Sequence, residues 1–137
     1  MTMQVLRCQV CAEPARTGLG FIFLAGPQAR RSQEATILTD QPPVCARHVR
    51  AAARLCPHLE GNPTVFLARS APLYGVHGTV YGIGDQGVQV VASPDHPLPY
   101  GHTNLSTFLA SQLVRRLHSF RILNLDELTQ ELAASAT

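Results

Sequence analysis

The sequence contains no lysine and no tryptophan, and aromatic residues make up only 6% of its 137 residues. With so few aromatic side chains, a hydrophobic core must rest on Leu, Val, Ile and Ala. All 11 basic residues are arginines. A genome biased towards arginine codons explains this most simply, and selection for bidentate contacts with phosphate or carboxylate groups is the alternative.

Charged residues are also scarce, at 15% of the chain against 45% hydrophobic residues. This balance excludes a disordered chain and predicts one modest domain or two small lobes. The longest apolar run, residues 19–25, is too short to span a bilayer, and no signal peptide is visible. We therefore expect a cytoplasmic protein with no membrane partner, in which the cysteines are metal ligands or buried thiols rather than disulfides.

Metal-ligand spacing is the most specific signal in the sequence. Two ligand pairs are present, Cys8-x-x-Cys11 and Cys45-x-x-His48. Zn²⁺ prefers four tetrahedral ligands, and thiolate and imidazole groups suit it. We expect both pairs to close one site, with the second pair on the first turn of a helix over residues 44–56. Four protein ligands leave no position for a catalytic water, so the predicted ion is structural.

Cys56 is the competing ligand. It lies about three helical turns beyond Cys45, so an intact helix would separate the two by roughly 16 Å along its axis. Because a zinc–sulfur bond is only about 2.3 Å long, one ion cannot hold both thiols. We therefore interpret Cys56 as a buried apolar side chain.

Residues 19–25 and 35–39 are rich in strand-forming side chains and predict a β-hairpin between the two ligand pairs. This order of parts resembles the treble-clef zinc finger over residues 5–58. The chain is also similar to small uncharacterised actinobacterial zinc-finger proteins that carry a Cys-Pro-His-Leu segment, here residues 56–59, and that likeness implies no activity. Treble-clef nucleases of the His-Asn-His type carry a histidine in the hairpin, and residues 19–39 contain none.

The pattern changes after residues 61–63, which we interpret as a linker between a zinc lobe, 1–60, and a second lobe, 64–137. In the second lobe the sequence predicts short strands over residues 64–69, 76–81 and 87–92. A hairpin turn at residues 85–87 is expected to join the last two. The expected fold class is α+β: a treble-clef zinc lobe followed by a small antiparallel β-sheet with one or two C-terminal helices.

Leucines at helical spacing predict the first of these helices, capped by Asn104 or Ser106 and ending at Phe120. A last strand is predicted over residues 121–125. Asp126 is then expected to cap a short second helix.

Five arginines of the first lobe are candidates for contacts with nucleic-acid phosphates. Residues 1–60 carry seven arginines and four acidic residues, a net charge of +3. Arg30 and Arg31 lie at the predicted hairpin tip, and a stripe along one helix face consists of Arg47, Arg50 and Arg54. The alternative is a solvated helix face, because no aromatic residues interleave these arginines.

The sequence thus favours a non-catalytic zinc-binding protein whose metal shapes a binding surface for DNA or RNA. An adaptor that binds only proteins is the second hypothesis, and a homodimer is compatible with the apolar leucine stripe. An enzyme is the third, because His96 and His102 share a Pro-rich loop and could form a general base or a second metal site. A polar loop shaped by its prolines is the simpler interpretation of that segment.

Overall fold

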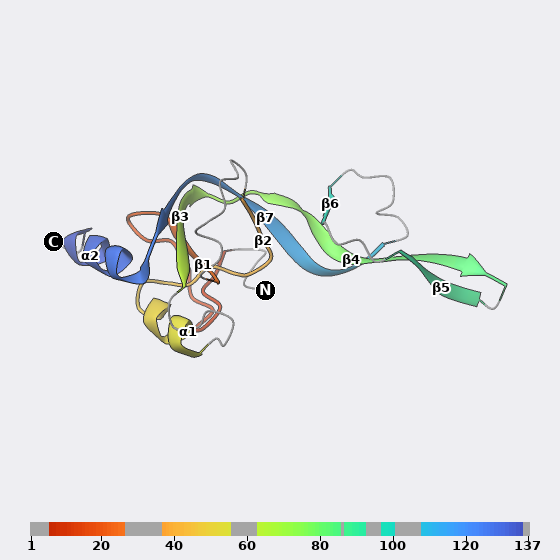
Figure 1. Ribbon diagram of the computed structural model, residues 1–137, viewed down its shortest axis with the longest axis horizontal. Coiled ribbons are helices and arrows are strands. Elements are labelled where there is room, and N and C mark those ends of the chain that lie inside the picture. Colours follow the sequence, from red (N-terminus) through yellow and green to blue (C-terminus); the bar gives the residue numbers. More distant parts are fainter. Residues whose placement is uncertain are drawn as a thin grey trace.

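An antiparallel β-sheet and two helices form the described part of the chain (Figure 1). The computed structural model describes residues 6–26, 37–55, 63–85, 87–92, 97–100 and 108–135. The strands are β1 (Phe21–Ala25), β2 (Ile37–Thr39), β3 (Thr64–Ser70), β4 (Leu73–Gly84), β5 (Gly87–Ala92), β6 (Leu98–Pro99) and β7 (Phe108–Leu123). The helices are α1 (Val49–Leu55) and α2 (Leu125–Ser135). The predicted α+β class is confirmed.

Strand β7 is the central strand of the sheet and pairs with β2, β3 and β4. The strand order is β1-β3-β7-β4-β5. Its C-terminal half pairs with β3 and its N-terminal half pairs with β4, both antiparallel. The register continues from one partner to the next, because Ser70 lies opposite His118 and Leu73 lies opposite Arg115. β3 and β4 therefore act together as one long partner of β7.

The junction between β3 and β4 is held by two consecutive arginines of β7. The backbone N–H of Arg116 donates to the Pro72 carbonyl at 3.0 Å, which continues the ladder across the junction. The side chain of Arg115 is buried and donates to the Ala71 carbonyl. Because Arg115 also pairs with Thr39, strand β2 occupies the opposite edge of β7.

Alternating side chains divide the core between the two faces of the sheet. One cluster joins the sheet to both helices and to the segment before α1: Ile22, Leu24, Val65, Leu67, Leu123, Val44, Val49, Ala52, Ala53 and Leu128. The other cluster lies on the opposite face and contains Phe21, Phe23, Phe66, Ala68 and Leu117. The rings of Phe66 and Phe120 meet edge-on there, with centroids 5.8 Å apart. The first face is the one that positions the candidate site.

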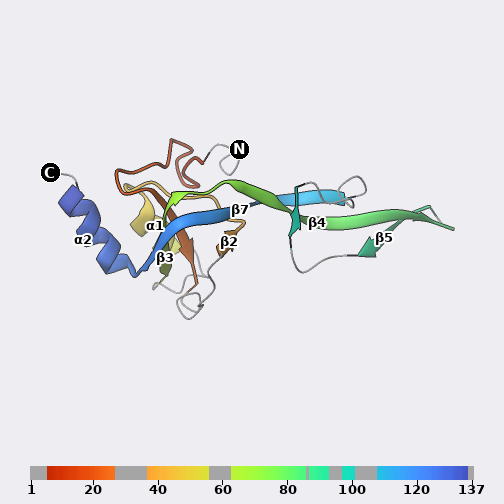
Figure 2. The same cartoon turned by 90° about the horizontal axis from the view of Figure 1, so that it is seen from above.

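The far part of β4 and the strand β5 extend away from both helices as a two-stranded arm (Figures 1 and 2). Gly84 pairs with Gly87 across the turn, and Gly87 has a positive φ of 101°. The predicted hairpin and the predicted strand over residues 87–92 are confirmed. The strand over residues 64–69 is confirmed as β3, and the one over residues 76–81 belongs to the longer β4.

Helix α2 begins with a capping box. The Asn124 side chain accepts a hydrogen bond from the Glu127 N–H at 2.7 Å, and the Glu127 carboxylate accepts one from the Asn124 N–H at 3.1 Å. The predicted helix is confirmed, but its cap is Asn124 rather than Asp126. Neither of the two helices in the described residues has the length and apolar character that crossing a membrane requires.

The helix predicted to end at Phe120 is wrong, because residues 108–120 belong to strand β7. Leu113 and Leu117 are four residues apart, and an even spacing keeps side chains on one face of a strand as well as of a helix. Pairing with β2, β3 and β4 decides between the two. The predicted last strand, residues 121–125, is the end of β7 and the start of α2.

The hairpin predicted from residues 19–25 and 35–39 is also wrong, and the treble-clef fold is not confirmed. β1 pairs along its whole length with β3, and β2 pairs with β7. Each of the two strands therefore pairs with a longer strand that is distant in the sequence, instead of with the other. Strands that precede the linker predicted at residues 61–63 thus pair with strands that follow it, and the division into two lobes stays a prediction.

Gly20 offers a direct test of how the segment before β1 packs on β3. Its φ is +125°, and an added Cβ would lie 2.5 Å from the Ala68 carbonyl oxygen. We expect Gly20→Ala to lower the free energy of unfolding by about 2 kcal/mol or more in urea denaturation. Gly18→Ala is the matched control, because a Cβ there meets nothing within 4 Å. Equal stability of the two variants would contradict this packing.

Candidate metal centre

The first ligand pair lies on a tight turn between residues 7 and 14. The Cys8 N–H donates to the Glu13 carbonyl and the Ala12 N–H donates to the Cys8 carbonyl, both at 2.8 Å. Ala12 has a positive φ of 61°, which turns the chain back on itself. The Val10 N–H points at the Cys8 sulfur, at 3.3 Å. The turn therefore places the Cys8 and Cys11 sulfurs close enough together to bind one metal ion.

The second ligand pair lies on the turn that leads into α1. The helix begins at Val49 rather than at the predicted residue 44, so Cys45 precedes it and His48 adjoins its first residue. The His48 N–H donates to the Cys45 carbonyl at 3.2 Å, and the His48 carbonyl accepts from Ala52 at 2.9 Å. This turn keeps the two side chains on one side although they are not both helical.

Two backbone hydrogen bonds bring the pairs together. The Val44 N–H donates to the Ile22 carbonyl at 2.9 Å, which fixes Cys45 beside strand β1. The Gln9 N–H donates to the Pro43 carbonyl, also at 2.9 Å, which ties the first turn to the second. The long separation of the pairs in the sequence is thus closed by main-chain contacts.

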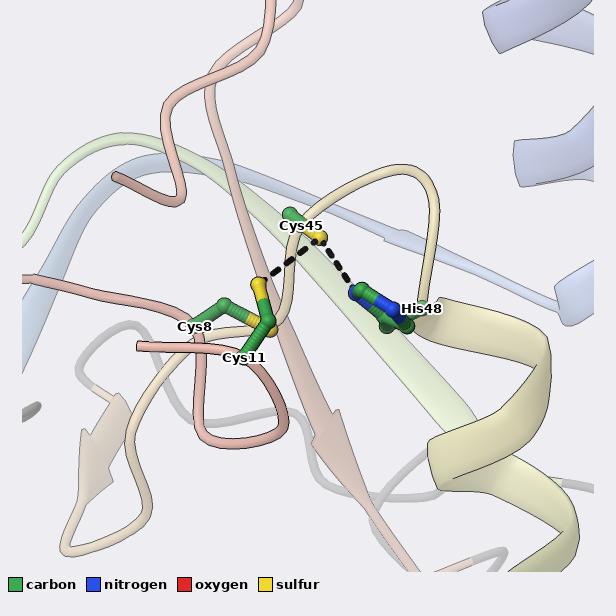
Figure 3. A group of neighbouring side chains, drawn as sticks. All are labelled: Cys8, Cys11, Cys45 and His48. Carbon is green, nitrogen blue, oxygen red and sulfur yellow. Dashed lines mark hydrogen bonds between the residues drawn. The ribbon is translucent and has the colours of Figure 1, made fainter. Parts of the chain in front are cut away.

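The four ligand atoms of Cys8, Cys11, Cys45 and His48 all lie within 4.8 Å of one another (Figure 3). The Cys11 and Cys45 sulfurs are 3.9 Å apart, and the Cys45 sulfur is 3.1 Å from Nδ1 of His48. A tetrahedral zinc ion with bonds of about 2.3 Å to sulfur holds its sulfurs roughly 3.8 Å apart. The three cysteines are free thiols rather than disulfides. The spacing suits a four-coordinate metal ion.

Burial and backbone N–H groups oppose each other at Cys8, which is fully buried. Burial raises the pKa of the Cys8 thiol, but hydrogen bonds from the backbone N–H groups of Cys45, Cys11 and Val10, together with one from the Cys45 thiol, outweigh it. They bring the pKa from 9.0 down to about 7. A thiolate at Cys8 is therefore favoured near neutral pH, which is the form that binds metal.

Cys45 behaves in the opposite way. Burial raises its pKa above 9.0, and the neighbouring Cys8 and Cys11 thiols raise it further. The His48 N–H lowers it without reversing the shift. Thiols that crowd each other in this way resist joint ionisation unless a cation balances them.

The donor set fits a soft or borderline metal ion. Three thiolates and one imidazole are ligands typical of structural zinc, whereas magnesium and calcium require oxygen ligands. The half-buried Cys11, Cys45 and His48 leave a path for the ion to enter, while Cys8 closes the inner side.

The other predicted site residues do not join this group. Arg47, Arg50 and Arg54 lie on and beside α1 and are exposed to solvent. Among the residues with described positions, none forms an ion pair with these arginines. Several further predicted residues lie outside the described residues: Arg30, Arg31, Cys56, His96, His102, Asn104 and Ser106.

Sequence reasoning missed one arginine near the ligands. Arg16 lines a cavity of about 400 Å³ that also touches Cys11 and Cys45. The turn from Thr17 to Gly20 brings it there, and each of these residues donates its N–H to the carbonyl of the other. No spacing rule links Arg16 to the cysteines, so only the folded chain reveals it.

No family model, no curated protein and no solved structure matches this chain. The functional conclusion therefore rests on the geometry of the chain itself.

The low pKa of Cys8 predicts a titration step in the metal-free protein. Thiolate absorbance should rise as the pH passes about 7, because Cys8 ionises there while Cys45 stays protonated. Cys8→Ser should remove this step, and Cys56→Ser should keep it. If ionisation begins only near the ordinary value of 9.0, the backbone N–H groups do not stabilise a thiolate.

Proposed function

We propose that the chain binds one structural Zn²⁺ through Cys8, Cys11, Cys45 and His48 and uses it to hold a binding surface in shape. The convergence of these four ligand atoms within 4.8 Å carries the proposal. Zinc suits the donor set best, because thiolate and imidazole match its softness and its tetrahedral geometry.

The position of the cluster favours a structural ion over a catalytic one. Four protein ligands fill a tetrahedral shell and leave no site for an activated water. The ion would join the first turn, the segment beside β1 and the start of α1, which share one hydrophobic cluster. Without a cation, three neighbouring thiols would contribute little to stability, so metal binding and folding of this region should be coupled.

Metal removal tests this proposal. Elemental mass spectrometry should find one zinc per chain, and a chelator should lower the melting temperature by about 10 °C or more. Cys45→Ser should lose the ion and melt as low as the chelated protein. Cys56→Ser should keep the metal. A metal-free preparation as stable as the zinc-loaded protein would refute a structural role.

Nucleic acid is the partner that we propose for the surface beside this ion. Support comes from Arg50 and Arg54, one helical turn apart on α1, and from Arg47 in the turn before it; all three are exposed and free of acidic partners among the described residues. Val49, Ala52 and Ala53 bury the other side of the helix. Guanidinium groups that face solvent in this way can each neutralise one phosphate.

Salt dependence checks the nucleic-acid proposal. Affinity for DNA or RNA should fall steeply with salt, and Arg50→Ala with Arg54→Ala should weaken binding to all sequences alike. On duplex DNA the double variant should reduce the slope of log affinity against log salt by about 1.8. Arg116→Ala is the control, because Arg116 is exposed but lies on β7, away from the stripe. Retention of neither DNA nor RNA by the zinc-loaded protein would refute this partner class.

A protein-binding adaptor is the second candidate, and strand β5 supports it. Val88 and Val90 are 76% and 58% exposed on the arm, where an edge strand could pair with another chain. A partner captured in the presence of nuclease, and lost in Val88→Lys, would favour this candidate. A homodimer stays a prediction, as does an enzyme that uses His96 and His102.

A further inference from the structure

A second cavity, of about 470 Å³, lies between the segment before β1 and the sheet. Its walls come from residues 16–20, from Leu67 and Arg69 of β3, and from Ser119 and Arg121 of β7. This volume falls in the range of sites for small ligands. No acidic residue lines the cavity, and three arginines do.

Arg16 is fixed over the ring of Phe21, with its guanidinium carbon 4.9 Å from the ring centroid. Such stacking restrains the side chain and leaves the N–H donors at the guanidinium edge free for another group. Arg16 is also exposed, and it forms no ion pair with any residue of known position in the structure. It is therefore a preoriented donor rather than part of a salt bridge.

Arg69 approaches the cavity from the sheet. Its side chain is exposed and has no acidic partner within the described ranges. The β3–β7 ladder skips the position opposite it, between the pairs Ala68–Phe120 and Ser70–His118. Ser119 occupies that position with a positive φ of 53°, a conformation that costs energy for a residue other than glycine. A strained serine thus faces an unpaired arginine at the wall of the cavity.

Arg121 is the third cation, and it is partly neutralised. Its two terminal nitrogens lie 3.2 and 2.6 Å from the carboxylate oxygens of Glu131 on α2. Glu131 holds the guanidinium in place but does not line the cavity. The three arginines and this carboxylate together give the site a charge of +2.

We propose that this cavity binds the phosphate group of a small phosphomonoester. A phosphomonoester is close to a dianion at neutral pH, which matches the charge of +2. Planar guanidinium groups bind phosphate oxygens in pairs. Leu67 is buried and Leu19 is half-buried, and both line the cavity, so they can contact the organic part of the ligand.

This inference goes beyond the proposed zinc and nucleic-acid roles. Arg16, Arg69 and Arg121 are neither candidate ligands nor members of the stripe along α1. The two sites nevertheless adjoin, because Arg16, Thr17 and Gly18 line both this cavity and the one beside Cys11 and Cys45. The turn that carries Cys8 and Cys11 leads directly into the segment that carries Arg16.

Calorimetric titration of the zinc-loaded protein tests the proposal, with inorganic phosphate and a nucleoside 5′-monophosphate as probes. Both should bind saturably, and the nucleoside without phosphate should not bind. Arg16→Gln and Arg69→Gln should each weaken binding by about tenfold or more, because each removes charge-assisted hydrogen bonds. Arg116→Gln is the matched control and should bind as the wild type does, because Arg116 is exposed on β7 but does not line the cavity.

Glu131→Gln provides a variant that should gain binding, which loss of folding cannot mimic. It frees Arg121 from its carboxylate, so affinity for the monophosphate should rise about two- to fivefold. Equal affinity of the wild type, Arg16→Gln and Arg69→Gln would overturn the proposal, as would equal binding of the nucleoside. The zinc content and oligonucleotide affinity of the same variants separate this result from a failure of the proposed zinc and nucleic-acid roles.

Discussion

Three thiols and one imidazole lie within 4.8 Å of one another in the N-terminal part of the structure, so the negative charge of their thiolate forms must be balanced there. Cys8 favours the thiolate, whereas Cys45 resists ionisation because its neighbours are also thiols. A divalent cation would resolve this conflict, since it would pair with all the thiolates at once. The same cation would hold the first turn, strand β1 and helix α1 in one arrangement.

The sheet gives this cluster its frame. A backbone hydrogen bond between Val44 and Ile22 of β1 fixes the position of the adjacent Cys45. Alternate side chains of β1 and β3 form the hydrophobic cluster that packs against the ligand-bearing segments. β1 is anchored by β3, and β3 by β7, so pairing between distant parts of the chain fixes the position of the site. A change in the β3–β7 register would therefore move the ligands, the stripe on α1 and the Arg16 cavity together.

Local spacing in the sequence was enough to find the ligand cluster but not to find its scaffold. Two residues between Cys8 and Cys11, or between Cys45 and His48, require only a turn, and turns are local. The leucine spacing before Phe120 suited both a helix and a strand, and only long-range pairing distinguishes them. Likewise, Arg16, Arg69 and Arg121 gather through the packing of a turn on two paired strands, which no short motif encodes.

The Cys8–Cys11–Cys45–His48 cluster and the Arg16 cavity adjoin, so a metal ion at the first would also order residues that line the second. A metal ion can stiffen a short, aromatic-poor region whose core is small, and the stiffened segment then carries cations at defined positions. In the proposed functions the arginines would supply the binding chemistry, and the cysteines would hold the arginine-bearing segments in position.

X-ray absorption at the zinc edge of the purified protein measures the ligands of the ion directly. Zinc bound by Cys8, Cys11, Cys45 and His48 should show a shell of three sulfurs at about 2.3 Å and one nitrogen at about 2.0–2.1 Å. A protein without zinc, or a zinc shell made mainly of oxygen atoms, would contradict this ligand set.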